Sequence, residues 1–139
     1  RRTDRRSDCP VNFALQLLGD SWSLLVIRDL MFKGKRTYAE FAGSEERIST
    51  NILADRLRSL VRAGLVRREG RGRGTRYSLT EKGVDLLPVL VEMILWSARH
   101  DPRTATPAEF IDQATNDREG LLAHLRDELM ASHLERGAV

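Results

Sequence analysis

Apolar residues recur every three or four positions along the first third of the chain, which is the spacing of helices that bury one side. The stretch "CPVNFALQLLGD" predicts a short helix that begins at Pro10, a residue tolerated in a first turn, and stops at Gly19. The denser stretch "SWSLLVIRDLMFKG" predicts a second helix with Ser21 as its N-cap and Gly34 at its end.

Two more helices and a change of period follow. The letters "TYAE" match a capping box from Thr37 to Glu40, and residues 48–64 carry an apolar stripe that ends at Gly64. "LVRRE" and "TRYSL" then have the composition of short strands, and the glycines of "GRGRG" between them suit the positive φ angles of a turn. The pattern therefore predicts a long helix followed by a β-hairpin.

The last 60 residues are predicted to be helical. Residues 81–101 are predicted as one helix, capped by Thr80 and bent at Pro88, and "TPAE" and a leucine seam predict two shorter helices beyond it. The long helix carries two apolar stripes: Val84, Leu87, Val91, Ile94 and Leu95 on one side, and Leu86, Val89, Leu90, Met93 and Trp96 on the other. One small domain does not easily cover both, so a second copy of the chain is predicted to cover one of them.

Charge is distributed unevenly along the chain. Residues 33–76 contain 12 Lys and Arg against five Asp and Glu, a difference of +7, whereas residues 101–139 contain four Arg against eight acids, a difference of −4. A basic middle segment of this kind favours a local contact with a polyanion.

Composition excludes several classes of function. The 139 residues suit one domain, no run of about 18 apolar residues is long enough for a bilayer, and the first residues lack the apolar core of a signal peptide, so we expect a cytoplasmic protein without a membrane partner. One cysteine and three scattered histidines offer no disulfide framework and no metal site. Without a nucleophile elbow or a phosphate-binding loop, we expect neither an enzyme nor a cofactor.

The order of these elements predicts a mainly α fold with a small β-hairpin, a winged helix-turn-helix. The polar side of the fourth helix would present Thr50, Asn51, Asp55 and Arg58 to base edges in the major groove of double-stranded DNA. Phosphate contacts are expected from Lys35, Arg36 and Thr37, and from Arg71 and Arg73 at the glycine-rich turn.

Three stretches, "CPVNFALQLLGDSWSLLVIRDLMFKGKRTYAEF", "ISTNILADRLRSLVRAGLVRRE" and "TRYSLTEKGVDLLPVLVEMILWSARH", closely resemble the HxlR-type winged-helix transcription regulators in order and spacing. The resemblance covers about residues 9–100. It implies a homodimeric, sequence-specific DNA-binding regulator with additional N- and C-terminal dimerisation helices. By position, Ser49 to Arg58 resemble the recognition helix and Arg71 to Arg76 the wing. The corresponding dimer interface comprises Leu15, Leu87, Val91, Ile94, Leu95 and Trp96.

The same resemblance divides the chain into three parts. Residues 1–8 are expected to form a flexible basic N-terminus, residues 9–100 the winged domain, and residues 101–139 a helical C-terminal extension. This tail is longer than the family pattern. It would extend the dimer interface, which we favour, or cover the pocket of a small effector.

Cys9 matches the N-terminal cysteine that several family members use to sense oxidants or electrophiles. A thiol beside a helix N-terminus is favoured in its reactive thiolate form, and Arg5 and Arg6 would act in the same direction. The alternative is a small buried apolar residue. Oxidation would need a second molecule, because the chain has no other cysteine.

Two functions are compared on this basis. The leading hypothesis is a homodimeric regulator, a repressor rather than an activator, that acts on an inverted-repeat operator under the control of Cys9 or a small effector. The alternative is a winged-helix adaptor that binds proteins and no specific DNA. A disordered RNA-binding tract is disfavoured, because "RGRG" occurs once and between strand-forming residues.

Overall fold

The computed structural model describes residues 6–135 of the chain, so residues 1–5, with Arg5 and most of the predicted N-terminal segment, and residues 136–139 lie outside the described residues. The contacts divide the chain into two compact units, Arg1–Leu79 and Thr80–Val139. The predicted domain limits at residues 8 and 100 follow the family resemblance and stay a prediction. None of the described helices has both the length and the apolarity needed to cross a bilayer.

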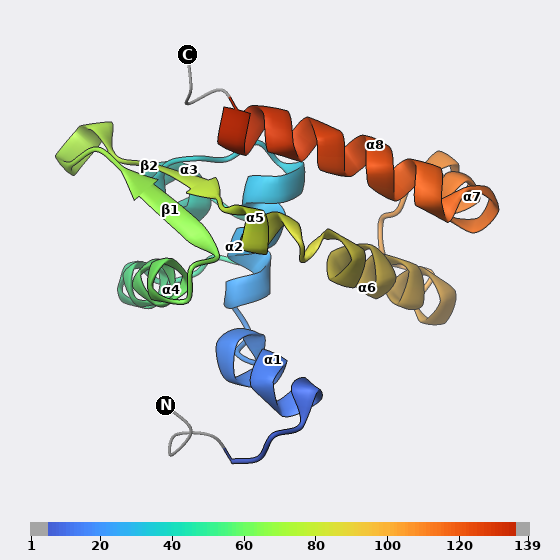
Figure 1. The fold of residues 1–139 in the computed structure, drawn as a ribbon, viewed down its shortest axis with the longest axis horizontal. Coiled ribbons are helices and arrows are strands. Elements are labelled where there is room, and N and C mark those ends of the chain that lie inside the picture. The colour runs from blue at the N-terminus through green and yellow to red at the C-terminus, as the bar shows by residue number, and fades with distance from the viewer. Residues whose placement is uncertain (1–5, 136–139) are drawn as a thin grey trace. The chain divides into compact units, whose positions relative to one another are not determined.

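In its described residues, the first unit contains four α-helices, a 3₁₀ turn at Gly72–Gly74 and a two-stranded antiparallel sheet (Figure 1). Its elements are α1 (Pro10–Leu18), α2 (Ser23–Phe32), α3 (Tyr38–Ala42), α4 (Thr50–Arg62), β1 (Val66–Glu69) and β2 (Arg76–Leu79). In the sheet, Val66 pairs with Leu79 and Glu69 pairs with Arg76. A helix-turn-helix followed by a hairpin is the predicted winged fold, and the prediction is confirmed.

Side-chain caps fix where the helices of the first unit begin. The hydroxyl of Thr37 accepts from the Glu40 amide and completes the predicted capping box of α3, and Ser49 Oγ accepts from the Ile52 amide at 3.3 Å to cap α4. Ser21 as the cap of α2 is wrong. The Asp20 carboxylate accepts instead from the amides of Trp22 and Ser23 at 2.8 and 2.9 Å, since a charged acceptor satisfies two amides better than a hydroxyl.

The core of the first unit forms where α2, α3 and α4 pack with the sheet. The buried apolar side chains include Ile27, Leu30, Phe41, Leu53, Leu60 and Leu79. The rings of Phe41 and Tyr77 meet edge to face with 6.0 Å between their centroids, which joins α3 to β2. Burying the apolar side of α4 in this way leaves its polar side on the surface.

The three glycines of the hairpin turn differ in their backbone φ angles. Gly70 and Gly72 have φ angles of +85° and +56°, as the turn prediction requires, whereas Gly74 does not have a positive φ. A Cβ at Gly70 would lie 2.7 Å from the carbonyl oxygen of Gly74, a distance that real Cβ contacts do not reach. Gly70 is therefore the position at which the tip of the hairpin requires glycine.

The second unit contains α5 (Glu81–Val84), α6 (Leu87–His100), α7 (Ala108–Asn116) and α8 (Arg118–Met130), and ends in a π-helical turn at Ala131–Glu135. The single bent helix predicted over residues 81–101 is wrong, because the chain breaks between α5 and α6. Pro88 lies in the first turn of α6, where its missing N–H is not needed. Thr80 caps α5 as predicted, accepting from the Gly83 amide at 3.1 Å.

Helix α8 packs against α5 and α6 within the second unit. Leu121 and Leu129 of the predicted leucine seam are buried, as is Leu90 of α6. Three ion pairs surround this apolar contact: Arg118 with Glu92, and Arg126 with both Asp85 and Glu81. The C-terminal extension is therefore part of a folded unit with α6.

Candidate nucleic-acid interface

Helix α4 presents polar side chains to solvent, and its first turn is held at both the cap and the backbone. Thr50, Asn51 and Arg58 are exposed. Ser49 caps the helix, and the phenol of Tyr38 in α3 donates to the Thr50 carbonyl at 2.7 Å. Helix α3 therefore holds the turn that carries the predicted base-reading residues.

Asp55 is the one acid among the predicted base-reading residues, and arginines of the same helix balance its charge. Its carboxylate pairs with Arg56 and lies 3.8 Å from Arg58. The hydrogen bond from Arg56 is the main cause that lowers the pKa of Asp55 below its usual value. Arg56 also lies 3.5 Å from Asp20, so its guanidinium belongs to the protein's own network.

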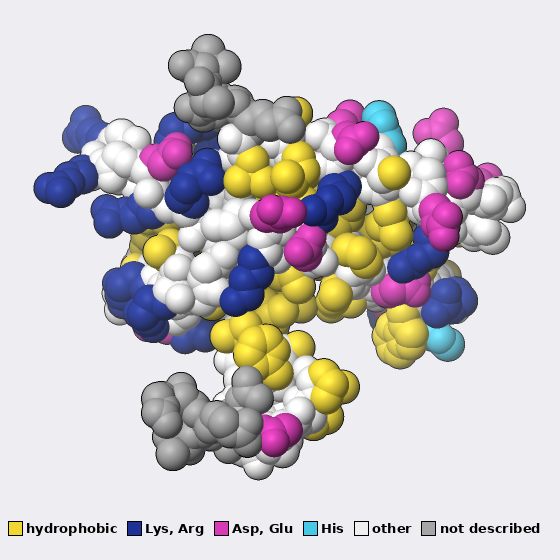
Figure 2. All heavy atoms as spheres, viewed as in Figure 1, with side chains coloured by type: hydrophobic (Ala, Val, Ile, Leu, Met, Phe, Trp, Pro, Cys, Tyr) yellow, Lys and Arg dark blue, Asp and Glu magenta, His cyan; other side chains and the backbone are white. Residues whose placement is uncertain are grey.

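A groove of about 430 Å³ lies in the first unit between α4 and the hairpin. Its cationic walls are Arg58 and Arg62 from α4 and Arg68 from β1, and its lining also includes Tyr38, Ala54, Leu57, Val61 and Tyr77. Figure 2 shows Lys and Arg side chains gathered over α4 and the hairpin. The guanidiniums of Arg62 and Arg68 suit the phosphate oxygens of a nucleic-acid backbone, and Arg58 belongs in addition to the predicted base-reading residues.

Arg68 was not among the sequence-predicted site residues. It stands opposite Tyr77 in the strand register, which turns it toward the groove. Its neighbour Arg67 pairs instead with Glu69 at 3.1 Å. Alternation along "VRRE" indicates that the two arginines point to opposite faces, but only the pairing of the strands and the position of α4 identify the one that lines the groove.

The wing residues lie where the sequence predicts. Arg71, Arg73 and Arg76 are exposed. Among the described residues, no hydrogen bond or ion pair engages the side chain of Arg71 or that of Arg73. Their charges are therefore available at the tip of the hairpin.

The structure corrects one of the three phosphate contacts predicted before α3, that of Arg36. Arg36 is only 8% exposed, its Nη1 donates to Ser78 Oγ at 2.9 Å, and its carbonyl accepts from the Tyr77 amide at 2.7 Å. Its guanidinium therefore joins this loop to β2 rather than facing solvent. The Lys35 ammonium donates to Ser44 Oγ at 2.8 Å, and the Thr37 hydroxyl is used by its cap, so both are also engaged within the fold.

A charged network that sequence reasoning missed ties α2 to the turn before α4. Asp29 is 2% exposed and accepts from Arg28 at 2.8 Å, and the same guanidinium donates to Glu46 at 2.7 Å. Lys35 lies 3.6 Å from Asp29 on its other side. The hydrogen bond from Arg28 lowers the pKa of Glu46 to about 2. The one feature of the sequence that could have predicted this network is Asp29, an acid within the mostly apolar stretch of α2.

Apolar side chains remain exposed on α1 and α6. On α1, no residue is buried, and Val11 and Leu15 are 65% and 54% exposed. On α6, Trp96 is 59% exposed, and Ile94 and Leu95 are half-buried. Leu87 and Val91, predicted at the dimer interface, are 2% and 0% exposed. They belong to the core of their own chain, so the predicted interface loses these two residues.

Cys9 is exposed and occupies the N-cap position of α1. The alternative that it is a small buried residue is therefore wrong. Its amide donates to Ser7 Oγ at 3.3 Å, and the guanidinium of Arg6 is held by Asn12 at 3.1 Å. The predicted contribution of Arg5 falls outside the described residues.

Sequence comparisons place this geometry among known regulators. The model of the HxlR-like helix-turn-helix family matches residues 17–105. The chain is 36% identical over 88 residues to the HTH-type transcriptional regulator sll1512 of Synechocystis sp., covering 61% of this chain and 64% of that relative, which is less than two thirds of its length. It is 32% identical over 104 residues to the regulator YdeP of Bacillus subtilis, covering 73% and 80%.

Two regulators of known structure share the fold and have more than 30% sequence identity to this chain. Quinone-bound YodB from B. subtilis is 36% identical, with a TM-score of 0.57 over 66% of this chain and 98% of that one. The redox regulator HypR in its oxidised form is 32% identical, with a TM-score of 0.59 over 70% of this chain and all of the other.

Proposed function

We propose that this chain, which belongs to the HxlR-like helix-turn-helix family, is a homodimeric transcriptional repressor that binds an inverted-repeat DNA operator. One observation carries this proposal: the capped polar start of α4 adjoins a groove with three guanidiniums. The start of α4 supplies side chains for base edges together with Arg58, and the other two guanidiniums of the groove, those of Arg62 and Arg68, are cations for the DNA backbone.

In this proposal, α4 enters the major groove with its N-terminal half leading. Asn51 is suited to an adenine edge and Arg58 to a guanine edge, since amide and guanidinium groups make two hydrogen bonds to these bases. Arg62 and Arg68 hold the phosphates beside the groove. Arg71 and Arg73 extend this backbone contact from the wing, at a phosphate or in a narrow minor groove.

The salt dependence of DNA affinity distinguishes contacts to the DNA backbone from contacts to the bases. Replacing Arg68 with alanine removes about one phosphate contact, so the slope of log K against log salt should become shallower by about 1, with affinity lost for most sequences. Arg103→Ala is the matched control, because this arginine pairs with Asp101 in the second unit. An unchanged slope for Arg68→Ala, measured by fluorescence anisotropy, would remove Arg68 from the interface.

The dimer is proposed to use the apolar surfaces of α1 and α6. A helix with no buried residue gains little from its own chain, so the exposed Val11 and Leu15 favour a partner surface. Leu15→Glu would place a charge in that interface. Sedimentation at micromolar concentration should show a dimer for the native chain and a monomer for the variant, and two identical dimers would exclude α1 from the contact.

Repression is the proposed effect, because a bound dimer needs only to occupy a promoter to block it. A transcription assay tests this step, on a template that carries a sequence selected from random DNA for binding to the protein. Addition of the protein should reduce the transcript, and an increase would reverse the sign of the regulation.

Oxidation of the Cys9 thiol is the proposed signal that changes DNA binding. The exposure of this thiol and the redox regulator HypR among similar structures support it. With a peroxide as oxidant, the Cys9 thiols of two copies would lose two electrons and two protons to form a disulfide, and the peroxide would become two hydroxylic products. DNA affinity with and without peroxide should change for the native chain and stay constant for Cys9→Ser; equal responses would exclude this input.

A further inference from the structure

Asp55, the only acid in the sequence of α4, has an arginine near each of its carboxylate oxygens. Oδ2 accepts from Arg56, and Oδ1 lies 3.8 Å from Nη2 of Arg58. The side chain of Arg58 is 63% exposed, against 48% for that of Asp55, so the arginine is the more accessible of the two to DNA. Both oxygens of the acid therefore have guanidiniums as neighbours.

A second acid holds Arg56 from outside the helix. Asp20, in the connection between α1 and α2, lies 3.5 Å from Arg56. The carboxylate of Asp20 is itself held by three hydrogen bonds, from the amides of Trp22 and Ser23 and from the Ser23 hydroxyl at 2.6 Å. Arg56 thus has an anchored acid on one side and Asp55 on the other, so its guanidinium has little freedom to release Asp55.

The two arginines next to Asp55 differ in what else they can bind. Arg56 is engaged by two acids within the protein, whereas Arg58 keeps N–H groups for DNA, because a guanidinium carries five donors. A long exposed side chain loses conformational freedom when it binds. A carboxylate that pairs with the arginine beforehand reduces this loss, and the remaining N–H groups can donate to O6 and N7 of a guanine.

We propose that Asp55 is a positioning residue that orients Arg58 toward a guanine, and that the anchored Arg56 holds Asp55 in place. This role rests on the proposed function, since it concerns the DNA contact of α4. The alternative is that Asp55 accepts a hydrogen bond directly from the amino group of a cytosine. The surroundings of its two oxygens favour the indirect role, because each already has a guanidinium as its neighbour.

A double-mutant cycle on base preference separates these two roles. The starting duplex is one selected from random DNA by the native chain, and Arg58→Ala identifies the position at which its guanine preference is lost. Affinities for duplexes with guanine or adenine there are measured by fluorescence anisotropy at fixed salt. Asp55→Asn should lower the ratio of these affinities roughly fivefold in the native chain and leave it unchanged in Arg58→Ala, because a residue that acts through Arg58 has no effect without it.

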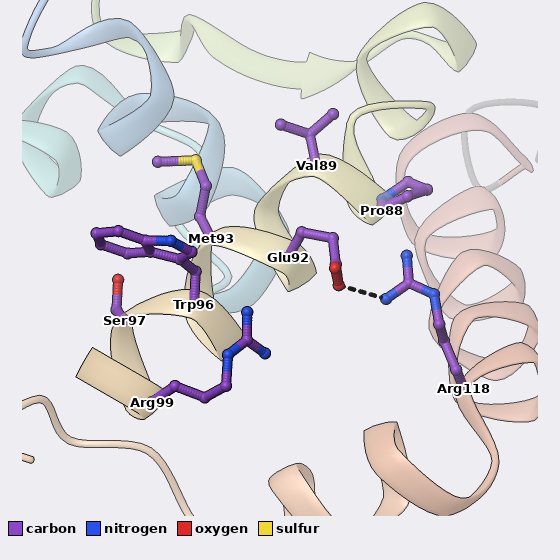
Figure 3. Close-up of a pocket in the computed structure, with 8 residues that line it drawn as sticks. All are labelled: Pro88, Val89, Glu92, Met93, Trp96, Ser97, Arg99 and Arg118. Carbon is purple, nitrogen blue, oxygen red and sulfur yellow. Dashed lines mark hydrogen bonds and ion pairs between the residues drawn. The ribbon is translucent and has the colours of Figure 1, made fainter. Parts of the chain in front are cut away.

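Substitutions of Arg56 test the second step. Arg56→Gln removes the cation between Asp20 and Asp55 and should lower the same guanine preference roughly threefold, whereas Arg56→Lys should restore part of it. Thermal unfolding of each variant identifies any loss of stability, which would weaken binding to both duplexes equally. Glu92→Gln is the matched control: it removes the acid of an exposed ion pair with Arg118, at 2.8 Å in the second unit (Figure 3), and should keep the native preference.

A guanine preference that is unchanged in Asp55→Asn would overturn the positioning role. An equal loss from this substitution with and without Arg58 would also overturn it and would assign Asp55 to a base of its own. Both results leave specific DNA binding by the native chain intact. A failure of the proposed function has a different result: the native chain would prefer no duplex over another, and the positioning role would be overturned with it.

Discussion

Arg36 offers a sharp test of the account, because the sequence places it at a phosphate and the structure places it inside the fold. Arg36→Ala removes a guanidinium that donates to Ser78 Oγ at 2.9 Å from a side chain only 8% exposed. The backbone bond from the Tyr77 amide to the residue 36 carbonyl is retained. The substitution therefore isolates the side chain's link between the α3 loop and β2.

The expected loss follows from these contacts. A hydrogen bond from a charged group contributes about 1.5–3 kcal/mol, and truncating a long buried stem adds some lost packing, so the free energy of unfolding should fall by roughly 2–3 kcal/mol. For a chain of this size, that corresponds to a fall in Tm of roughly 6–12 °C. Ser78→Ala should reproduce part of the fall, because it removes the acceptor.

Two measurements on the same variants decide between a structural role and a DNA contact. Thermal unfolding followed by circular dichroism should show the loss for Arg36→Ala, while the salt slope of DNA binding, taken well below the melting temperature, should not change. Arg71→Ala, at the exposed tip of the hairpin, should behave in the opposite way. An unchanged Tm with a salt slope shallower by about 0.9 for Arg36→Ala would refute the reasoning.

Three further predictions concern the supports of α4 and the hairpin. The pKa of Glu46 lies at about 2, below its usual 4.5, because Arg28 donates to it, so this carboxylate contributes stability above pH 4.5 that is lost as the pH falls toward 2. In Glu46→Gln, the free energy of unfolding measured with urea should therefore fall less steeply as the pH is lowered. The difference should be no more than about 1 kcal/mol, because the site is partly exposed, and an unchanged pH dependence would contradict the Arg28–Glu46 ion pair. Gly70→Ala should lower the unfolding free energy by at least about 1 kcal/mol, since φ is +85° there, whereas Gly74→Ala, with open space around its Cβ, should be nearly neutral; equal Tm values would reject the turn geometry. Tyr38→Phe removes the hydrogen bond to the Thr50 carbonyl and should cost about 1 kcal/mol of stability by urea unfolding, with no change expected if the phenol were solvated.

Local chemistry made much of the fold predictable from sequence. The capping box at Thr37, the cap at Ser49 and the positive φ at Gly70 each depend on residues within a few positions of one another. The prediction failed at Ser21, where the neighbouring Asp20 was a better acceptor, and at Pro88, where a bend was expected and the helix instead divides. In both cases the sequence offered two nearby residues or interpretations for one helix boundary, and the wrong one was preferred.

The site was harder to predict, because its charges are distributed by tertiary packing. Arg36 and Arg68 look alike in a basic segment, yet one is buried against Ser78 and the other lines the groove beside α4. Similarly, the apolar pattern of α6 did not separate Val91, which the chain buries, from Trp96, which it exposes. Sequence periodicity predicts which side of a helix or strand is apolar. Which other element packs against that side is determined by the tertiary fold.

Selection of bound duplexes from a pool of random DNA tests the central claim most directly. The native chain should enrich an inverted repeat, with half-sites about one or two helical turns apart, and Asn51→Ala should lose the preference at one position in each half-site while keeping its affinity for DNA of any sequence. Recovery of a pool no different from the input would contradict specific DNA binding and favour the winged-helix adaptor.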